Sequence, residues 1–250
     1  MEKISQEYPL AIVREGGLGA LLNYLDFFST NVQRTAVTAA ANCCRNVSQE
    51  HYQMVRDVFP MLRNVLAYPD QRLVEQASLA VLRAIESYRH KPEFLETLLD
   101  VGMVRALNSL LMPASGAALL SPATYTHMLR ALSGAAKVSA KVTLAFLEAG
   151  MVDTIYQILT GVVPGAHEAD EQGASETGQG LGGGLKDMVV LQNLAHRPKD
   201  QIEETLSLIC ELLPPVPKGA APPPYPSLSL SSSPTLISRA AGTDLASPSH

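Results

Sequence analysis

The chain has 250 residues, enough for one large domain or two small ones, and 46% of them are hydrophobic, so a folded part can bury a sizeable core. Its net charge of −5 is spread thinly, which gives no electrostatic footprint for a nucleic-acid partner. The cysteines, Cys43, Cys44 and Cys210, are odd in number and two are adjacent, which excludes a regular disulfide framework and favours a reducing compartment.

The first residues, MEKISQEYPL, lack the apolar region of a secretory signal. No apolar run approaches the ~20 residues that a membrane helix needs. We therefore expect a protein of the cytoplasm or nucleus without a membrane partner.

Residues 4–161 follow a helical pattern that repeats along the chain. The segment LDVGMVRAL, residues 99–107, returns 48 residues later as LEAGMVDTI, and REGGLGALL at residues 14–22 is a weaker copy. A shift of 41 residues pairs apolar with apolar residues, for example Leu21 with Leu62, Val32 with Leu73, and Ala36 with Ala77. A period of about 41 to 48 residues is typical of armadillo and HEAT repeats, so we predict an all-α solenoid over residues 1–161.

Each unit is expected to contain a short helix, a turn, a second helix and a longer third helix. Three turns read Glu15-Gly16-Gly17, Asp100-Val101-Gly102 and Glu148-Ala149-Gly150, where glycine suits a left-handed helix terminus. The turn of the second unit reads Asp57-Val58-Phe59-Pro60 and lacks glycine.

The third helices are expected to start at polar breaks. Ser29 and Asp70 are suited to cap two of them. Small residues let neighbouring helices approach closely in the first unit: Ala36, Ala39, Ala40 and Cys43. The first unit starts in the middle of a helix at Met1, and a solenoid needs its core face covered, so we expect a longer array or a partner at that end.

The chain changes character after the repeats. Residues 162–185 are rich in Gly and acidic, which predicts a flexible loop. Residues 186–213 form a final helical segment that we expect to pack on the repeats, with Cys210 on its apolar face. Residues 214–250 are dominated by Pro, Ser and Ala, which predicts a disordered tail.

Two blocks resemble a known family. The first is EYPLAIVREGGLGALLNYLDFFSTNVQRTAVTAAANCCRNV, in which AAANCC stands where armadillo repeats carry A-L-x-N-L-A, and the second is LSLICELLPPVPK. Together they resemble, over roughly residues 4–218, the armadillo-like region of HECT-type ubiquitin ligases of the ubiquitin-fusion-degradation and thyroid-receptor-interacting class.

This resemblance implies a role in protein ubiquitination. Such ligases carry ubiquitin on a catalytic Cys of a C-terminal HECT domain, and no segment of this chain resembles that domain. The expected role is therefore non-catalytic substrate recognition and scaffolding. The implied partners are a protein substrate or its degron, ubiquitin, and the remainder of the ligase.

Other residues of types that can carry chemistry are more simply explained by structural roles. Cys43 and Cys44 lack the C-x-x-C spacing of zinc sites and are expected to be packing residues. The histidines are scattered without an i, i+4 pair: His51, His90, His127, His167, His196 and His250. Gly182-Gly183-Gly184 lacks the context of a phosphate loop and is expected to be linker. We predict no catalytic, cofactor or metal site.

Asn42 occupies the place where peptide-binding armadillo proteins carry an asparagine that bonds the peptide backbone. The 41-residue shift brings Arg83 to the next such position, Gly134 follows at the third, and Trp is absent. The asparagine ladder is therefore broken, which argues against a groove of the nuclear-import-receptor type.

One face of the first two third helices remains as a candidate protein-binding surface. Residues three to four apart share a helix face, which groups Arg34, Thr38, Asn42 and Arg45, and, after the shift, Glu75, Leu79, Arg83 and Glu86. They predict a mixed, mildly basic docking groove for a degron or ubiquitin. The alternative for this face is a solvated surface without a ligand.

Two other functions stay open from the sequence. A free-standing armadillo-like adaptor without ubiquitin function fits the same repeats. A self-contained enzyme has little support, because no cluster of convergent polar residues is evident.

Overall fold

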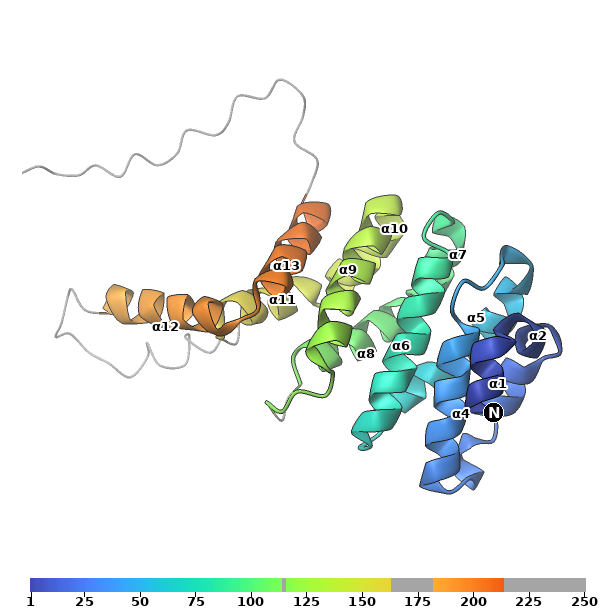
Figure 1. Ribbon diagram of the computed structural model, residues 1–250. Helices are drawn as coiled ribbons and strands as arrows, with labels where there is room; N and C mark the ends of the chain where they lie inside the picture. The colour runs from blue at the N-terminus through green and yellow to red at the C-terminus, as the bar shows by residue number, and fades with distance from the viewer. Residues whose placement is uncertain (114–115, 163–181, 214–250) are drawn as a thin grey trace, which may run out of the picture. The chain divides into compact units, whose positions relative to one another are not determined.

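The computed structural model describes residues 1–113, 116–162 and 182–213, which lie in one compact unit, Met1–Pro214. Every regular element in these ranges is a helix, which confirms the all-α prediction (Figure 1). The α-helices are α1 (Glu2–Glu7), α2 (Pro9–Arg14), α3 (Gly17–Leu22), α4 (Thr30–Cys43), α5 (Tyr52–Val65), α6 (Gln71–Ser87), α7 (Pro92–Leu98), α8 (Val101–Leu111), α9 (Pro122–Val138), α10 (Ala140–Glu148), α11 (Met151–Thr160), α12 (Gly182–His196) and α13 (Lys199–Leu212), and the 3-10 helices are η1 (Leu25–Phe27) and η2 (Gln49–His51).

The long helices α4, α6, α9 and α13 stack side by side, and we call them the third helices. Each packs against the next, and the short α1 packs against α4 at the start of the series (Figure 1). The remaining helices of each unit, such as α3, α5 and α8, form the other layer. The arrangement confirms a solenoid of armadillo-like units.

Polar caps set where the third helices begin. Asp70 accepts hydrogen bonds from the backbone N–H groups of Arg72 and Leu73 at the start of α6, and Ser121 accepts one from Thr124 at the start of α9. These bonds satisfy donors that a helix leaves unpaired in its first turn. Ser29 occupies the same position before α4, but its side chain makes no capping bond.

The predicted close packing of α4 is confirmed by its small residues. Ala36, Ala39, Ala40 and Cys43 are all buried, with at most 5% of their surface exposed. Without bulky side chains on these faces, α4 can approach α1 and α6 closely enough for backbone groups of one helix to reach side chains of the next.

The second unit differs from the sequence expectation. Residues 57–60, expected as a turn, lie inside the continuous helix α5, which runs from Tyr52 to Val65 with Pro60 in its interior. Because no glycine is present to adopt the left-handed conformation, nothing ends the helix there. The first and second helices of this unit are therefore fused.

The glycine turns follow the prediction in two of three units. Gly16 and Gly150 have positive φ angles of 76° and 81°. In the third unit Gly102 lies within α8, because Asp100 caps that helix and accepts a hydrogen bond from the N–H of Met103 at 2.7 Å.

The C-terminal helices also refine the expected boundaries. Most of the expected loop (162–185) and the expected tail (214–250) lie outside the described residues. Residues 182–184, expected as linker, are the first residues of α12. They stand in the first turn of the helix, and glycine destabilises a helix chiefly in its interior. Helix α13 packs on α9 as the third helix of the last unit.

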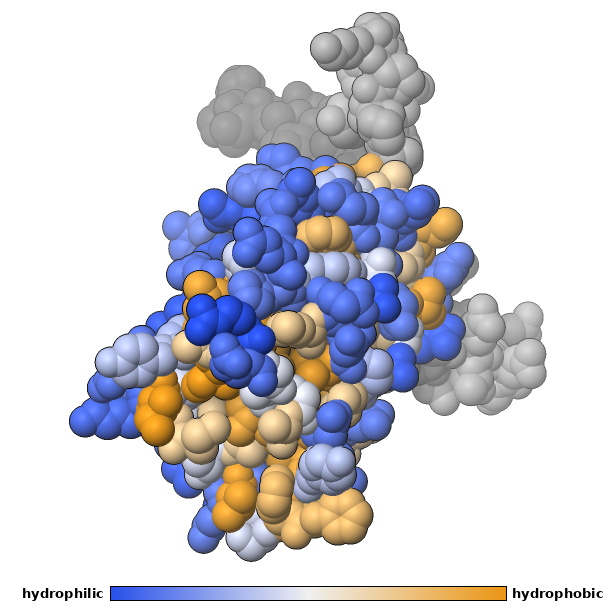
Figure 2. Space-filling view, turned by 90° about the vertical axis from the view of Figure 1, so that its right-hand side faces the viewer, coloured by the Kyte–Doolittle hydropathy of each residue, from blue (hydrophilic) through white to orange (hydrophobic). Residues whose placement is uncertain are grey.

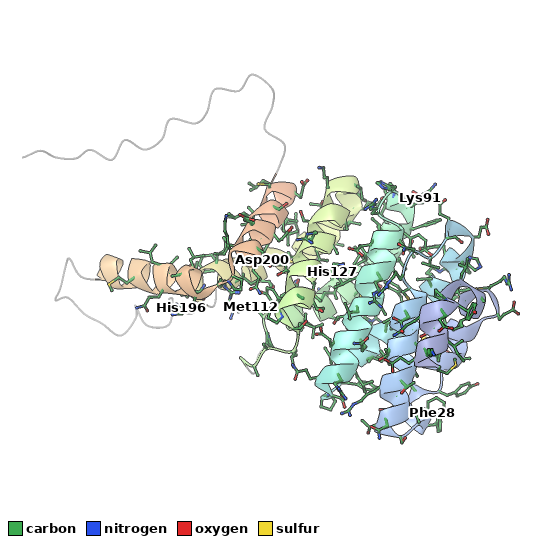
Figure 3. All side chains as sticks on the ribbon, viewed as in Figure 1. Phe28, Lys91, Met112, His127, His196 and Asp200 are labelled. Atoms are coloured by element: carbon green, nitrogen blue, oxygen red, sulfur yellow. The ribbon has the colours of Figure 1, made fainter. Side chains whose placement is uncertain are left out.

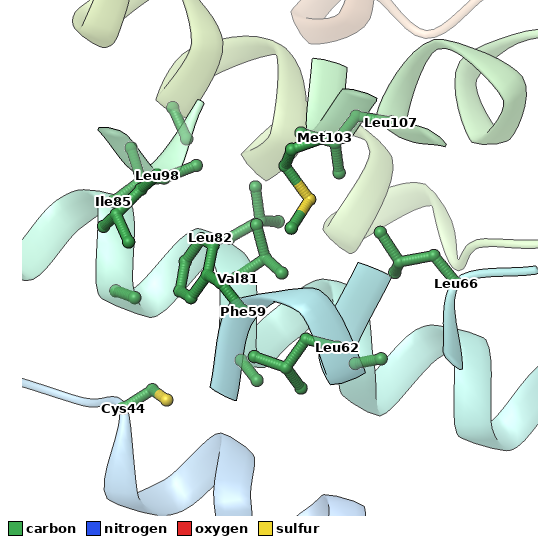
Figure 4. Close-up of a cluster of buried hydrophobic side chains, with 14 of the residues drawn as sticks. Cys44, Phe59, Leu62, Leu66, Val81, Leu82, Ile85, Leu98, Met103 and Leu107 are labelled. Carbon is green, nitrogen blue, oxygen red and sulfur yellow. The ribbon is translucent and has the colours of Figure 1, made fainter. Parts of the chain in front are cut away.

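The core runs through the interface between the two layers. Figure 4 shows Leu62 of α5, Leu82 of α6 and Met103 of α8 meeting in one cluster, and each is at most 2% exposed. Tyr52 stacks on Phe94 with ring centroids 3.8 Å apart, and Tyr88 meets both rings edge-on. These rings join α5, α7 and the C-terminal end of α6, where Tyr88 follows Ser87, so two units share one aromatic cluster.

Candidate protein-binding groove

A hollow runs along the third helices near their N-termini. It has a volume of about 700 Å³ and is lined by Glu2, Asn31, Arg34, Thr35, Thr38, Gln71, Arg72, Glu75, Gln76 and Ser121. We call it the third-helix groove. Three of the residues predicted from the sequence line it: Arg34, Thr38 and Glu75.

Two of these three residues already have partners in the neighbouring helix. The guanidinium of Arg34 donates to Asp70 Oδ2 from Nη2 at 2.7 Å and from Nε at 3.1 Å. Glu75 Oε1 accepts from the hydroxyls of Ser121 at 2.7 Å and Thr124 at 2.6 Å. The residue five positions after the cap of one third helix thus contacts the cap of the next.

The ion pair with Arg34 changes the acidity of Asp70. The Arg34 hydrogen bond, helped by the backbone N–H groups of Leu73 and Arg72, holds the pKa of the Asp70 carboxyl below its ordinary value. Asp70 is therefore ionised at neutral pH and neutralises Arg34. The groove is consequently less basic than the sequence predicted.

Asn42 and Arg83 link three helices rather than facing a ligand. Asn42 Nδ2 donates to Ser5 Oγ of α1 at 3.1 Å, and Arg83 Nη1 of α6 donates to Asn42 Oδ1 at 3.3 Å and to the carbonyl of Ala41 at 2.7 Å. Burial and, after it, the nearby charge of Arg45 lower the pKa of Arg83. Arginine nevertheless remains charged at neutral pH.

The last predicted residues lie beyond the groove. Arg45 follows α4 and is exposed, and its side chain makes no hydrogen bond or ion pair within the described part of the chain. Glu86 bonds His127 of α9 at 2.7 Å, and Figure 3 shows His127 between α9 and α6. Leu79 is half-buried and packs on the core. Cross-links therefore occupy this end of the surface.

Three groove residues with free side chains were not among the predicted site residues. Asn31, Arg72 and Gln76 line the groove, and their side chains make no hydrogen bond or ion pair among the described residues. A signal was available, because the 41-residue shift that pairs Arg34 with Glu75 also pairs Asn31 with Arg72. Asn31, Arg72 and Gln76 therefore occupy helix positions adjacent to those of the predicted residues Arg34, Thr38 and Glu75.

The described residues show no built site for metal or thiol chemistry. In these ranges no three His, Cys, Asp or Glu side chains gather to hold a metal ion. Burial raises the pKa of the Cys43 thiol to about 11 and that of Cys44 to about 12. Both thiols are therefore protonated at neutral pH. Because only the thiolate is a good nucleophile, neither is suited to nucleophilic chemistry. Cys210, expected on an apolar face, is exposed instead.

The described helices were also compared with the length of a membrane span. No single one of them is both long and apolar enough to cross a bilayer. Only α10 and α11 together reach this length and composition, and the pair is bent by 70°.

Comparison with solved structures confirms the fold. A designed armadillo repeat protein in complex with the peptide (KR)4 superposes with a TM-score of 0.55, covering 85% of this chain and 90% of that chain at 16% identity. Computationally designed armadillo repeat proteins for modular peptide recognition superpose with a TM-score of 0.56, the same coverage and 16% identity.

Comparison with curated proteins gives the relatives, although no protein-family model matches the chain. The E3 ubiquitin-protein ligase UPL3 of Arabidopsis thaliana is 36% identical over 88% of this chain, and the aligned part is 11% of that protein. A probable ubiquitin fusion degradation protein of Schizosaccharomyces pombe is 28% identical over 86% of the chain and 12% of that protein. The E3 ubiquitin-protein ligase TRIP12 of Danio rerio is 26% identical over 87% of the chain and 10% of that protein.

The chain thus spans about a tenth of the length of the curated relatives that it matches. The alignments cover most of this chain in proteins from a plant, a yeast and an animal, and the fold is the armadillo-like solenoid that the sequence blocks indicated. Over most of its length the chain is therefore homologous to one region of E3 ubiquitin-protein ligases such as UPL3 and TRIP12, and its fold is armadillo-like.

Proposed function

We propose that this chain is the non-catalytic substrate-recognition and scaffold region of a HECT-type E3 ubiquitin ligase, and that the third-helix groove holds an extended segment of the substrate. The observation that carries the proposal is the position of this open polar groove in a chain that is homologous to ubiquitin ligases over 88% of its length.

The free side chains of the groove suit a polypeptide backbone. Asn31 and Gln76 can each donate and accept hydrogen bonds through their carboxamides, and Thr38 adds a hydroxyl. Alternating N–H and C=O groups of an extended peptide need both kinds of partner. Two arginines line the groove, and Arg34 is paired with Asp70. Arg72 forms no ion pair among the described residues, so its charge is available to a ligand.

The mechanism is positioning without chemistry. A substrate segment held on a rigid stack of helices raises the effective concentration of its lysines near a catalytic domain. The cross-links Arg34–Asp70 and Glu75–Ser121 keep α4, α6 and α9 in register, so the free side chains of α4 and α6 stay at fixed spacings.

A test compares two ligase variants in cells. Thr38→Arg with Gln76→Arg fills the groove with long cations without removing any cross-link, and Met54→Arg places the same side chain on α5, outside the groove. Self-ubiquitination of the ligase reports catalysis, and quantification of ubiquitin-modified peptides reports substrates.

We expect the groove variant to lose ubiquitination of a defined set of proteins while self-ubiquitination is retained, and Met54→Arg to behave as wild type. Identical substrate sets for the groove variant and the wild-type ligase would contradict the proposal.

A further inference from the structure

A second hollow lies in the other layer of the solenoid, where α5, α7 and α8 meet. It has a volume of about 520 Å³ and shares no residue with the third-helix groove. We call it the second-layer hollow. Its floor is the hydrophobic core, because Phe59, Leu98 and Met103 line it, are at most 4% exposed and lie in the buried cluster of Figure 4. Exposed apolar residues gather elsewhere, in the lower part of the N-terminal end of the stack that Figure 2 shows. The groups that the hollow offers to a partner are mainly polar.

Two arginines border the hollow on one face of α5. Arg56 and Arg63 are two helical turns apart, so their Cα atoms are separated by about 10 Å along the helix axis. Arg56 Nε lies 3.8 Å from Asp57 Oδ1. Arg63 Nη1 lies 3.7 Å from Asp100 Oδ2. Both separations exceed the length of a hydrogen bond, and neither guanidinium makes one within the described part of the chain. Their N–H groups are therefore available to a ligand.

The two aspartates beside these arginines already have other hydrogen-bond donors. Asp57 Oδ1 accepts from Gln53 Nε2 at 2.7 Å, one turn earlier on α5. Asp100 Oδ1 accepts from the backbone N–H of Met103 at 2.7 Å, as the cap of α8. A carboxylate from outside the chain can therefore bond the guanidiniums without displacing either aspartate from its present hydrogen bond.

Gly102 determines where the guanidinium of Arg63 lies. A Cβ atom built at residue 102 would stand 2.6 Å from Arg63 Nη1, closer than real Cβ atoms approach their neighbours. The guanidinium thus occupies the space beside α8 that the side chain of any other residue at position 102 would take. A side chain that is already restricted to one place loses less conformational entropy when it binds a ligand.

Pro60 adds a hydrogen-bond acceptor between the two arginines. It lies inside α5 and has no N–H, so the carbonyl of Arg56, four residues earlier, lacks its usual helical donor. Arg56 and Pro60 both line the hollow, so this carbonyl lies on the same side of the helix. The backbone N–H groups of a partner helix are bonded within that helix, whereas those of an extended segment are free to donate. The carbonyl therefore favours an extended partner.

We propose that the second-layer hollow binds an extended acidic segment of a partner protein. Two carboxylates of that segment accept hydrogen bonds from Arg56 and Arg63, and a backbone N–H between them donates to the carbonyl of Arg56. Arginine binds a carboxylate through paired N–H groups, and such charged bonds are stronger than bonds between neutral groups. A phosphate dianion fits less well, because it would bring a second negative charge toward Asp57 and Asp100.

The partner is selected by the geometry of these bonds more than by long-range attraction, because the two arginines and two aspartates of the hollow cancel in formal charge. The binding of a segment here is independent of what the third-helix groove holds, since the two hollows share no residue.

A pair of synthetic peptides tests the proposal on the 250-residue chain. The probe is fluorescein-labelled GEGEGEGEG, whose carboxylates share one face when the peptide is extended, and the control peptide carries Gln in place of each Glu. Fluorescence anisotropy measures both affinities.

Three variants separate a built site from general charge attraction. Arg56→Gln with Arg63→Gln removes both guanidiniums. Gly102→Ala keeps every charge but displaces the guanidinium of Arg63. Arg105→Gln removes an exposed arginine of α8 that does not line the hollow. Circular dichroism checks that each variant is folded.

We expect the Glu peptide to bind the wild-type chain at least ~10-fold more tightly than the Gln peptide. The double arginine variant should lose this preference, Gly102→Ala should weaken it, and Arg105→Gln should retain it. Equal affinity for the two peptides, or no binding of the Glu peptide, would overturn the proposal. So would an effect of Arg105→Gln as large as that of the double variant, or tighter binding of a peptide with phosphoserine in place of each Glu.

Discussion

The side-chain amide of Asn42 joins two helices by accepting a hydrogen bond from Arg83 at 3.3 Å and donating one to Ser5 at 3.1 Å. The asparagine that the sequence suggested as a remnant of a peptide-binding ladder is therefore part of the scaffold. Arg83, which replaces the next asparagine of that ladder, bonds back to α4 instead of facing outward.

Replacing Asn42 with Ala is expected to destabilise the chain by about 1–3 kcal/mol, because its partners are left partly buried without their hydrogen bonds. Denaturant unfolding followed by circular dichroism measures this change. Thr38→Ala, one turn earlier on the same helix and without a hydrogen bond, is the matched control and should change stability by at most ~0.5 kcal/mol. Equal effects of the two substitutions would contradict the linking role.

Val32 and Leu73 form a second matched pair, because they occupy equivalent positions in α4 and α6 but only Leu73 is buried. In the 250-residue chain Leu73→Ala should cost about 2–5 kcal/mol through the cavity that it leaves. Val32→Ala should change stability by only ~0.5 kcal/mol, since its side chain is half in water. Thermal unfolding distinguishes them, and a large cost at Val32 in the monomer would refute its exposed placement.

Acid should weaken the contact between α4 and α6. Because Arg34 lowers the pKa of Asp70 in the folded state, the stability that this pair contributes is complete above the ordinary aspartate pKa of about 4 and is lost as the pH falls through the folded value. The difference in unfolding free energy between wild type and Asp70→Asn should therefore shrink from pH 7 to pH 3. Arg34→Gln should reduce this pH dependence but not remove it, because the backbone N–H groups of Leu73 and Arg72 also lower the pKa of Asp70. A difference that stays constant across the range would argue against the ion pair.

The three thiols should react with very different rates. Burial raises the pKa of Cys43 and Cys44 to about 11 and about 12, whereas Cys210 is exposed. Iodoacetamide at pH 8 should therefore alkylate Cys210 first, and the other two only after unfolding in urea, as read by mass spectrometry of peptides. Fast labelling of Cys43 or Cys44 in the folded chain would show that α4 is more open than the structure has it.

The helical repeat could be predicted from the sequence because apolar spacing and caps act locally. The pairing of Val32 with Leu73 and the capping role of Asp70 needed only the 41-residue register. The fusion of two helices at Pro60 does not follow from the repeat register, because the register places a turn there whether or not a glycine is present to end the helix. The exposure of Cys210 was missed because an apolar stripe on α13 is buried only where another helix covers it.

The candidate groove was only partly predictable for a different reason. Sequence spacing correctly placed Arg34, Thr38 and Glu75 near one another, but it could not show which polar side chains are already bonded across helices. Arg34 and Glu75 are occupied by Asp70 and Ser121, residues of a neighbouring helix start. Among the described residues the side chains of Arg72 and Gln76 make no hydrogen bond or ion pair, and their place in the groove depends on how α6 packs beside α4, which spacing along one helix does not give.

A photo-crosslinking amino acid placed at Gln76 in the full-length polypeptide tests the proposed substrate-binding role of the third-helix groove most directly, with the same crosslinker at Met54 as the control position. We expect that proteins crosslinked from Gln76, and not from Met54, are ones whose ubiquitination falls in the Thr38→Arg, Gln76→Arg variant. Crosslinks that are the same from both positions, or crosslinked proteins whose ubiquitination is unaffected by that variant, would contradict a substrate-binding role for the third-helix groove.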